Sequence, residues 1–455
     1  MKKLFKGGTV VSGTKSGTVD VLIEDEVITR IGENLTCPDA EIIDVTGKLL
    51  FPGFVDAHTH FDLHVAGTVT ADDFESGTRA ALRGGTTTVI DFATQYEGET
   101  LEEGLQNWFG KARGKANCDY SFHMAISEWN PEVCDEIQKM IDEGITSFKL
   151  YMTYDNQVDD KTMYQILKRL KEVDGITGVH CENSGVIAAM QQDAKEKGLM
   201  DVATHAATRP APCEAEAIDR LLRIAEIVDT PVIVVHLTCK EGLEVIEAAR
   251  NRGQKVYTET CPQYLLMNDD KYQLPGFEGA KYVCAPPLRK PEDQQALWNA
   301  LSKDEIQTIS TDHCSFTTEQ KRLGLEDFTK IPGGMPGVET RATLIYTYGV
   351  RENKITLEQM CRLMSENPAR LYGLYPRKGT IREGSDADIV ILNPKTEDVL
   401  TAGDQEQRVD YSPFEGTKVT GRIEDVYLRG HHVVKNHQIA ETHQGKFLHR
   451  KTYNL

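Results

Sequence analysis

From Phe51 onward, short apolar runs alternate along the chain with longer amphipathic stretches. Eight runs have the length and β-branched content of buried strands; they are FVDAHTH, TTTVIDFA, DYSFHMAI, TSFKLYM, TGVHCEN, PVIVVHLT, KVYTETC and IQTISTDH. Apolar residues recur at helical spacing in two of the intervening stretches, at Met163, Ile166, Leu167 and Leu170 and at Ile218, Leu221, Leu222 and Ala225. Eight buried strands separated by helices predict an α/β fold, the (β/α)8 or TIM barrel.

The two ends of the chain have a different pattern. Short strand-like runs broken by Gly, Asp and Asn fill the first fifty residues, and similar runs return in GTIREGSDADIVIL and RIEDVYLRGHHVV. Two further helices, in GVETRATLIYTYGV and LEQMCRLMSENPARLYGL, precede that return. We therefore expect residues 1–52 and 376–455 to form one small β-sandwich domain, and residues 53–375 to form the barrel domain.

Six side chains able to serve a metal site lie at or near the ends of predicted strands one, four, five, six and eight. They are His58, His60, Lys149, His180, His236 and Asp312. The carboxyl ends of barrel strands meet at one face, where active sites of this fold are built. The pattern predicts that these side chains converge there.

Each of these residues has a simpler explanation when taken alone. A single histidine in an apolar run is more often a hydrogen-bonded core residue, Lys149 could pair with a carboxylate, and Asp312 could cap the next segment. Their joint placement on five strands favours a metal site. Four imidazoles and a carboxylate suit zinc, with manganese as the alternative. Lys149 fits if CO2 converts its amine to a carbamate, whose two oxygens could bridge two divalent ions.

Composition narrows the class of protein. The net charge of −19 over 455 residues, with no basic stripe, argues against nucleic-acid binding. No apolar stretch approaches the roughly 20 residues that cross a bilayer, and the N-terminus lacks the apolar segment of a secretory signal. The 10 cysteines show no framework spacing, which favours reduced thiols in a cytoplasmic protein.

Many short blocks along the chain resemble one family, the cyclic amidohydrolases that include dihydropyrimidinases and bacterial D-hydantoinases of the phenylhydantoinase type. The blocks are PGFVDAHTHF, GGTTTVIDF, SFKLYMTY, VHCEN, CEAEAI, ETCPQYLL, PPLR, STDHCSF, PGVETR, NPARLYGLYPRKGTI, GSDADIVIL and YSPFEG. The resemblance spans nearly the whole chain. It implies hydrolysis of the cyclic amide bond of hydantoins and dihydropyrimidines to N-carbamoyl amino acids.

The resemblance also implies a role for each ligand. His58, His60 and Asp312 would hold the buried metal, and His180 and His236 the more exposed one. Lys149, as N6-carboxylysine, and a hydroxide would bridge the two ions.

Further residues receive catalytic and substrate-binding roles. Tyr154 matches the tyrosine that donates to the substrate carbonyl oxygen, and Asp312 would act as base and then as acid. Leu63 and Tyr151 are expected to face the ring substituent. Two positions that bind the ring in the family differ in this chain. Ala285 and Gly333 occupy the positions where most relatives have serine and asparagine. Their main-chain groups remain available, so binding is still expected.

Three other functions compete with this interpretation. An allantoinase or dihydroorotase would use similar metals; Tyr154 argues against it, while Ala285 and Gly333 favour it. A non-catalytic scaffold related to dihydropyrimidinases would have lost the ligands, and all are present. A single-metal deaminase would not need Lys149. We expect a small cyclic ureide or imide as substrate and assembly as a homotetramer or homodimer, as in relatives.

Overall fold

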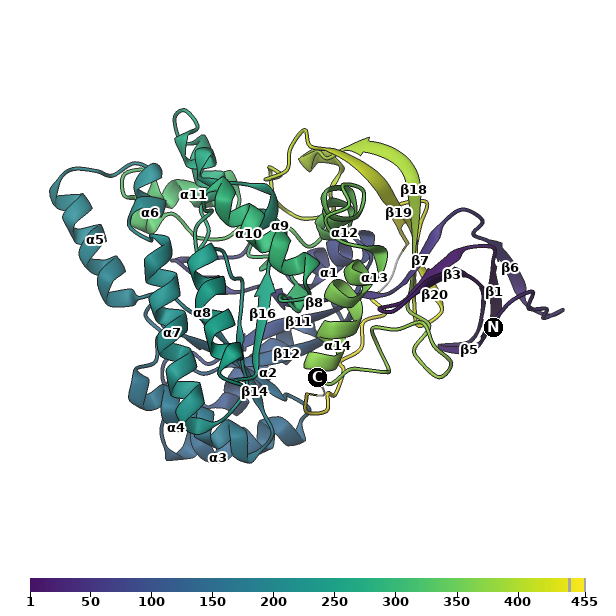
Figure 1. Ribbon diagram of the computed structural model, residues 1–455, viewed down its shortest axis with the longest axis horizontal. Coiled ribbons are helices and arrows are strands. Elements are labelled where there is room, and N and C mark those ends of the chain that lie inside the picture. Colours follow the sequence, from purple (N-terminus) through teal and green to yellow (C-terminus); the bar gives the residue numbers. More distant parts are fainter. Residues whose placement is uncertain (441–442, 454–455) are drawn as a thin grey trace.

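Eight parallel strands form the central sheet of the protein (Figure 1). The computed structural model describes residues 1–440 and 443–453. The strands pair in chain order and are β8 (Phe54–Thr59), β11 (Thr86–Thr94), β12 (Asp119–Ala125), β13 (Ser147–Tyr151), β14 (Ile176–His180), β15 (Val232–Val234), β16 (Val256–Thr260) and β17 (Thr308–Ile309). The predicted barrel and each of its eight strands are confirmed.

The barrel closes between its first and last strands by a bridge, without a continuous ladder. Thr59 pairs with His313, and the His60 N–H donates to the His313 carbonyl oxygen at 2.8 Å. Strand β17 is only two residues long, so the segment after it completes the closure. This brings the residues after β8 next to those after β17.

Helices follow most of the strands and cover the outside of the barrel. They are α1 (Phe74–Arg83), α2 (Leu101–Ala112), α3 (Pro131–Asp142), α4 (Asp160–Glu172), α5 (Ser184–Glu196), α6 (Ala203–Ala207), α7 (Ala211–Val228), α8 (Lys240–Asn251), α9 (Pro262–Leu266), α10 (Pro291–Ser302) and α11 (Thr318–Lys321). The apolar positions predicted on α4 and α7 are all buried. A capping box at Thr100 begins α2, and Asn130 with Pro131 begins α3.

The two helical stretches predicted after the last barrel strand are present, and each contains one turn of the wider π-helix. The first is α12 (Arg341–Ile345) followed by a π-helical turn at Tyr346–Val350. The second is α13 (Leu357–Cys361), a π-helical turn at Arg362–Glu366, and α14 (Asn367–Leu371). Both therefore continue beyond their short α-helical cores.

Strands from the two chain ends lie together beside the barrel (Figure 1). One sheet has the order β5-β4-β1-β6 and the other β21-β20-β19-β18-β7-β2-β3. Their bounds are β1 (Lys2–Lys6), β2 (Thr9–Val11), β3 (Ser16–Thr18), β4 (Asp20–Glu24), β5 (Val27–Gly32), β6 (Glu41–Asp44), β7 (Leu49–Pro52), β18 (Ile389–Val399), β19 (Lys418–Leu428), β20 (His431–Lys435) and β21 (Gln438–Ile439). The N-terminal strand β7 pairs with both β2 and the C-terminal strand β18.

One hydrophobic cluster joins the two terminal sheets. Phe5 and Ile23 from the first sheet pack with Leu50, Ile389 and Tyr427 from the second. This is the packing of a β-sandwich. The division of the chain at 52/53 and 375/376 into two domains stays a proposal.

The C-terminal segment covers the amino-terminal end of the barrel. The Tyr120 N–H donates to the Lys446 carbonyl, and the Leu448 N–H donates to the Tyr120 carbonyl. Arg450 is buried there, and its guanidinium donates to the hydroxyls of Ser121 and Ser147 at 2.8 Å each. We call this end, defined by Asp119, Ser121 and Ser147, the barrel floor. Within the described part of the chain, no helix is long and apolar enough to cross a membrane.

Candidate active site

All residues given a site role from the sequence line one cavity of about 860 Å³ at the carboxyl ends of the strands, here called the barrel mouth. They are His58, His60, Leu63, Lys149, Tyr151, Tyr154, His180, His236, Ala285, Asp312 and Gly333. His58, Lys149 and His180 lie within their strands, while His60, His236 and Asp312 lie within three residues of a strand end. The strand order places them around a common centre.

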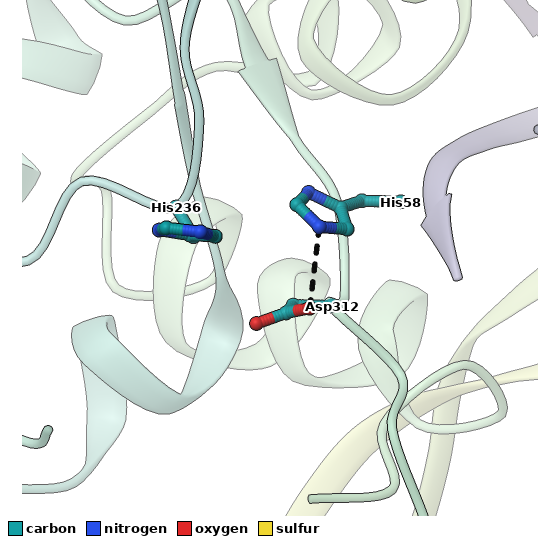
Figure 2. Close-up of side chains that lie close together, drawn as sticks. All are labelled: His58, His236 and Asp312. Atoms are coloured by element: carbon teal, nitrogen blue, oxygen red, sulfur yellow. Dashed lines mark ion pairs between the residues drawn. The ribbon is translucent and has the colours of Figure 1, made fainter. Parts of the chain in front are cut away.

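Three of these side chains approach closely enough to share a metal ion. One ligand atom each from His58, His236 and Asp312 lies within 4.8 Å of the other two. Figure 2 shows the three side chains pointing toward one another, with the ion pair between His58 and Asp312 marked. Asp312 Oδ1 lies 3.2 Å from His58 Nε2 and 3.1 Å from His60 Nε2. The His180 ring centroid is 4.5 Å from that of His236, which extends the cluster.

The unpaired nitrogens in this cluster are suited to metal binding. His58 Nε2, His60 Nδ1 and His236 Nδ1 are buried and make no hydrogen bond. Buried polar atoms normally have a hydrogen-bond partner, so these three nitrogens, of which His58 Nε2 also lies 3.2 Å from Asp312, are available to a ligand such as a metal ion. Imidazole nitrogens with a carboxylate are donors for zinc and similar ions. The residues present therefore fit divalent metal.

Two carboxylates outside the predicted set hold the histidines in place. Glu259 Oε1 lies 2.6 Å from His58 Nδ1, and Glu182 Oε2 lies 2.7 Å from His180 Nε2. Both glutamates are fully buried. A metal-binding histidine commonly donates its second N–H to such a carboxylate, which fixes the ring and its tautomer. Glu182 also accepts from the Arg209 guanidinium at 2.7 Å.

The environment of Lys149 favours its neutral amine. Its side chain is 1% exposed, and burial lowers its pKa to about 8, although Asp312 and Glu259 oppose the shift. Among the described residues, its amine makes no hydrogen bond and no ion pair; its nearest aromatic contacts are the rings of Phe92 at 5.0 Å and Tyr151 at 5.1 Å. A neutral amine is the form that adds to CO2.

Asp312 and Tyr154 have opposite protonation tendencies. Burial alone would raise the pKa of Asp312, but His58, His60 and Lys149 hold it at about 2, so the carboxylate is ionised. The Tyr154 side chain is 39% exposed at the cavity, and its hydroxyl keeps its proton at neutral pH because the ordinary pKa of a phenol is about 10. Tyr154 has φ of 72° and its ring centroid is 5.0 Å from that of His180. A proton donor therefore stands beside the metal-binding histidines.

Comparisons with known proteins agree with this site. A family model described as "Amidohydrolase family" matches residues 49–433. A D-hydantoinase from Geobacillus stearothermophilus is 46% identical over 100% of this chain and 97% of its own length. A D-phenylhydantoinase from Escherichia coli is 40% identical over 100% and 99%. The crystal structure of dihydropyrimidinase from Brevibacillus agri has a TM-score of 0.98 at 43% identity, covering 100% of this chain and 99% of that one.

This chain belongs to the amidohydrolase family. Within the family it falls in the branch of hydantoinases and dihydropyrimidinases, as the resemblance of its motifs predicted. Amidohydrolases depend on metal ions, and the donor cluster at the barrel mouth fits that dependence.

Sequence reasoning missed the residues that support the amidohydrolase ligands. Glu182 stands inside VHCEN and Glu259 inside KVYTETC, both apolar strand segments where a carboxylate is anomalous. That anomaly was a usable signal. No sequence signal marked Lys321 as a buried residue, because it lies in the polar stretch TTEQKR; in the structure it is 1% exposed.

Proposed function

We propose that this protein hydrolyses the ring amide of 5-substituted hydantoins and of dihydropyrimidines, releasing N-carbamoyl amino acids. One observation carries the proposal: every predicted metal, catalytic and ring-binding residue lines a single cavity. The full-length similarity to proteins named D-hydantoinase, D-phenylhydantoinase and dihydropyrimidinase supports the substrate class.

We propose two divalent ions per chain, zinc with manganese as the alternative. His58, His60 and Asp312 would hold one, His180 and His236 the other, and Lys149 would join both as N6-carboxylysine. The buried, unpaired histidine nitrogens and the lowered pKa of Lys149 support these roles. Bound divalent ions supply an activated water at neutral pH and polarise a carbonyl group.

The protein's own side chains would move the protons and stabilise charge. Asp312, held ionised, accepts the proton of the attacking water and later delivers it to the departing ring nitrogen. The Tyr154 hydroxyl, which is protonated at neutral pH because a phenol has a pKa of about 10, donates to the carbonyl oxygen as negative charge develops there. Main-chain groups of Ala285 and Gly333 hold the ring, while Leu63 and Tyr151 face its substituent.

We also propose a cytoplasmic location and assembly as a homotetramer or homodimer. The ten cysteines are free in the structure, as suits a reducing compartment. Analytical ultracentrifugation of the purified protein tests the assembly, and a monomer at micromolar concentration would refute it.

A substrate panel tests the proposed function. The metal-loaded protein is incubated with dihydrouracil, 5-monosubstituted hydantoins, allantoin and dihydroorotate, and ring opening is followed with chiral analysis of the products. We expect N-carbamoyl products from the first two classes. Turnover of only allantoin or dihydroorotate would assign the protein to the competing ring-opening amidases, and no turnover at all would support the scaffold.

A further inference from the structure

Two chain segments, 283–286 and 332–334, form one wall of the cavity, here called the imide wall. Ala285 and Gly333 are partly or fully exposed at the cavity, Gly334 also lines it, and the other residues of the wall are buried. The main-chain N–H and C=O of Ala285 and Gly333 make no hydrogen bond to any described residue. Exposed donors and acceptors of this kind match the alternating N–H and C=O edge of a cyclic imide.

A single buried lysine joins the two segments of the imide wall. Lys321, at the end of α11, is 1% exposed. Its Nζ lies 2.9 Å from the carbonyl oxygen of Val283, 2.7 Å from that of Pro332 and 2.8 Å from that of Gly334. The three carbonyl oxygens match the three N–H donors of an ammonium, although burial lowers the pKa of Lys321 to about 7. No carboxylate among the described residues forms an ion pair with it.

The contacts of Lys321 flank Gly333 on both sides. The carbonyls before and after it are fixed, and the Gly334 N–H donates to the Val283 carbonyl at 2.9 Å. A Cβ placed on Gly333 would meet only the Ala285 nitrogen, at 4.0 Å. Ala285 and Gly333 are thus neighbours, and the main chain of Gly333 makes no hydrogen bond to a described residue.

Two further side chains hold the residues around Ala285. His205 Nε2 lies 2.8 Å from the Cys284 carbonyl oxygen, and the Tyr264 hydroxyl donates to the Pro286 carbonyl at 2.9 Å. The neighbouring carbonyls are therefore occupied, and those of Ala285 and Gly333 remain available to a ligand.

We propose that Lys321 is a positioning residue for substrate binding: its ammonium ties the two segments of the imide wall so that Ala285 and Gly333 present their main-chain groups to the substrate ring. The inference rests on the proposed function, because it takes a cyclic ureide or imide as the ligand. It assigns a binding role to a residue that lies behind the wall and touches no substrate.

This role differs from simple structural support in a measurable way. A lysine that only stabilised the fold would affect the unfolding temperature and leave KM unchanged in the folded protein. A lysine that positions the wall affects binding of every ring equally, because the wall contacts the ring and not its substituent. Loss of binding shared by ground and transition states raises KM with little change in kcat.

The test compares Lys321→Met with a control at a half-exposed lysine, Lys171→Met, whose ammonium also pairs with Asp229. Lys171 also donates to a main-chain carbonyl, that of Val228 at 2.9 Å, but it lies on α4 and does not line the cavity. For Lys321→Met we expect KM to rise about 10-fold for dihydrouracil and for hydantoins with different substituents, with kcat changed less than about 3-fold. Metal content should equal that of the wild type. The control should keep the wild-type KM.

A second variant covers the case in which Lys321→Met does not fold. Lys321→Gln keeps two N–H donors and removes the charge, and we expect a KM between those of wild type and the methionine variant. Wild-type KM in either folded, metal-loaded variant would overturn the inference, as would a KM increase confined to one ring substituent. If wild-type protein opens none of the rings, the proposed function fails first; if it is active and the Lys321 variants bind normally, this inference alone fails.

Discussion

The mouth and the floor of the barrel both bury charged side chains, but they partner them differently. At the floor, Lys378 Nζ lies 2.7 Å from carboxylate oxygens of Asp119 and Asp388 and 3.0 Å from Asp386. At the mouth, Lys149 is buried to the same degree and pairs with no carboxylate among the described residues. The same side chain is a satisfied structural cation in one place and an unpaired amine in the other.

The pKa values follow from that difference. Burial alone would lower the pKa of Lys378, but Asp119 and Asp388 outweigh it and raise the pKa above its usual value. Burial lowers the pKa of Lys149 to about 8 because the nearby carboxylates do not compensate. A buried charge without a partner is costly, so its presence at the mouth points to a ligand or a modification there. Of these two buried lysines, carboxylates neutralise the one at the floor and not the one at the mouth.

The largest effect should come from removing the amine at the mouth. Lys149→Ala is expected to lose both metal ions and to lower ring-opening turnover by about 10³-fold or more, since the water pKa would return from about 7 toward about 15.7. Metal analysis by plasma mass spectrometry and steady-state kinetics measure the two effects. Normal turnover in this variant would remove the bridging role of Lys149.

The next effect should separate the proton donor from the ligands. Tyr154→Phe keeps the ring and removes the hydroxyl, and we expect kcat to fall about 10²- to 10³-fold, as for the loss of one oxyanion donor. Metal content should stay at the wild-type level. Equal loss of metal would instead make Tyr154 a structural part of the mouth.

A smaller effect should come from a support residue behind the ligands. Glu259→Gln preserves shape but weakens the contact to His58 Nδ1, and we expect metal affinity to fall about 10- to 100-fold. Competition with a chelator measures the affinity. Unchanged affinity would show that the His58 ring is held by packing alone.

The smallest effect on turnover should come from the floor. Lys378→Met removes the cation that pairs with Asp386 and Asp388, while Asp119 keeps its pair with Arg429. We expect the free energy of unfolding to fall by about 3–5 kcal/mol. Turnover at a temperature where the variant is folded should stay near the wild-type value. Denaturant unfolding measures the loss of stability, and steady-state kinetics measures turnover. A large loss of kcat in the folded variant would show that Lys378 also contributes to catalysis, against the assignment of the floor to stability.

Several features of the fold were accessible from local pattern, while others were not. The eight barrel strands were found because each is a continuous apolar run, and the periodicity of α4 matched its buried face. Strand β1, in KKLFK, was missed because three of its five residues are lysines. Its partners β4 and β6 lie later in the chain.

The candidate site divides in the same way. The convergence of the proposed metal ligands could be predicted because each lies at or near a strand end, and the barrel topology brings those ends together. Lys321 could not be predicted, because its carbonyl partners lie 11, 13 and 38 residues away in irregular segments. Nothing in TTEQKR marks the lysine as buried.

The amino-acid sequence by itself determined the fold class, the family and the set of side chains that line the cavity at the barrel mouth, since these depend on residue type and on periodicity within each element. Only the tertiary structure decided which buried groups are paired and which are left for a ligand. The physical reason is that the hydrogen bonds of a buried atom depend on groups from distant segments of the chain. The local sequence pattern does not show which of those segments will lie next to it.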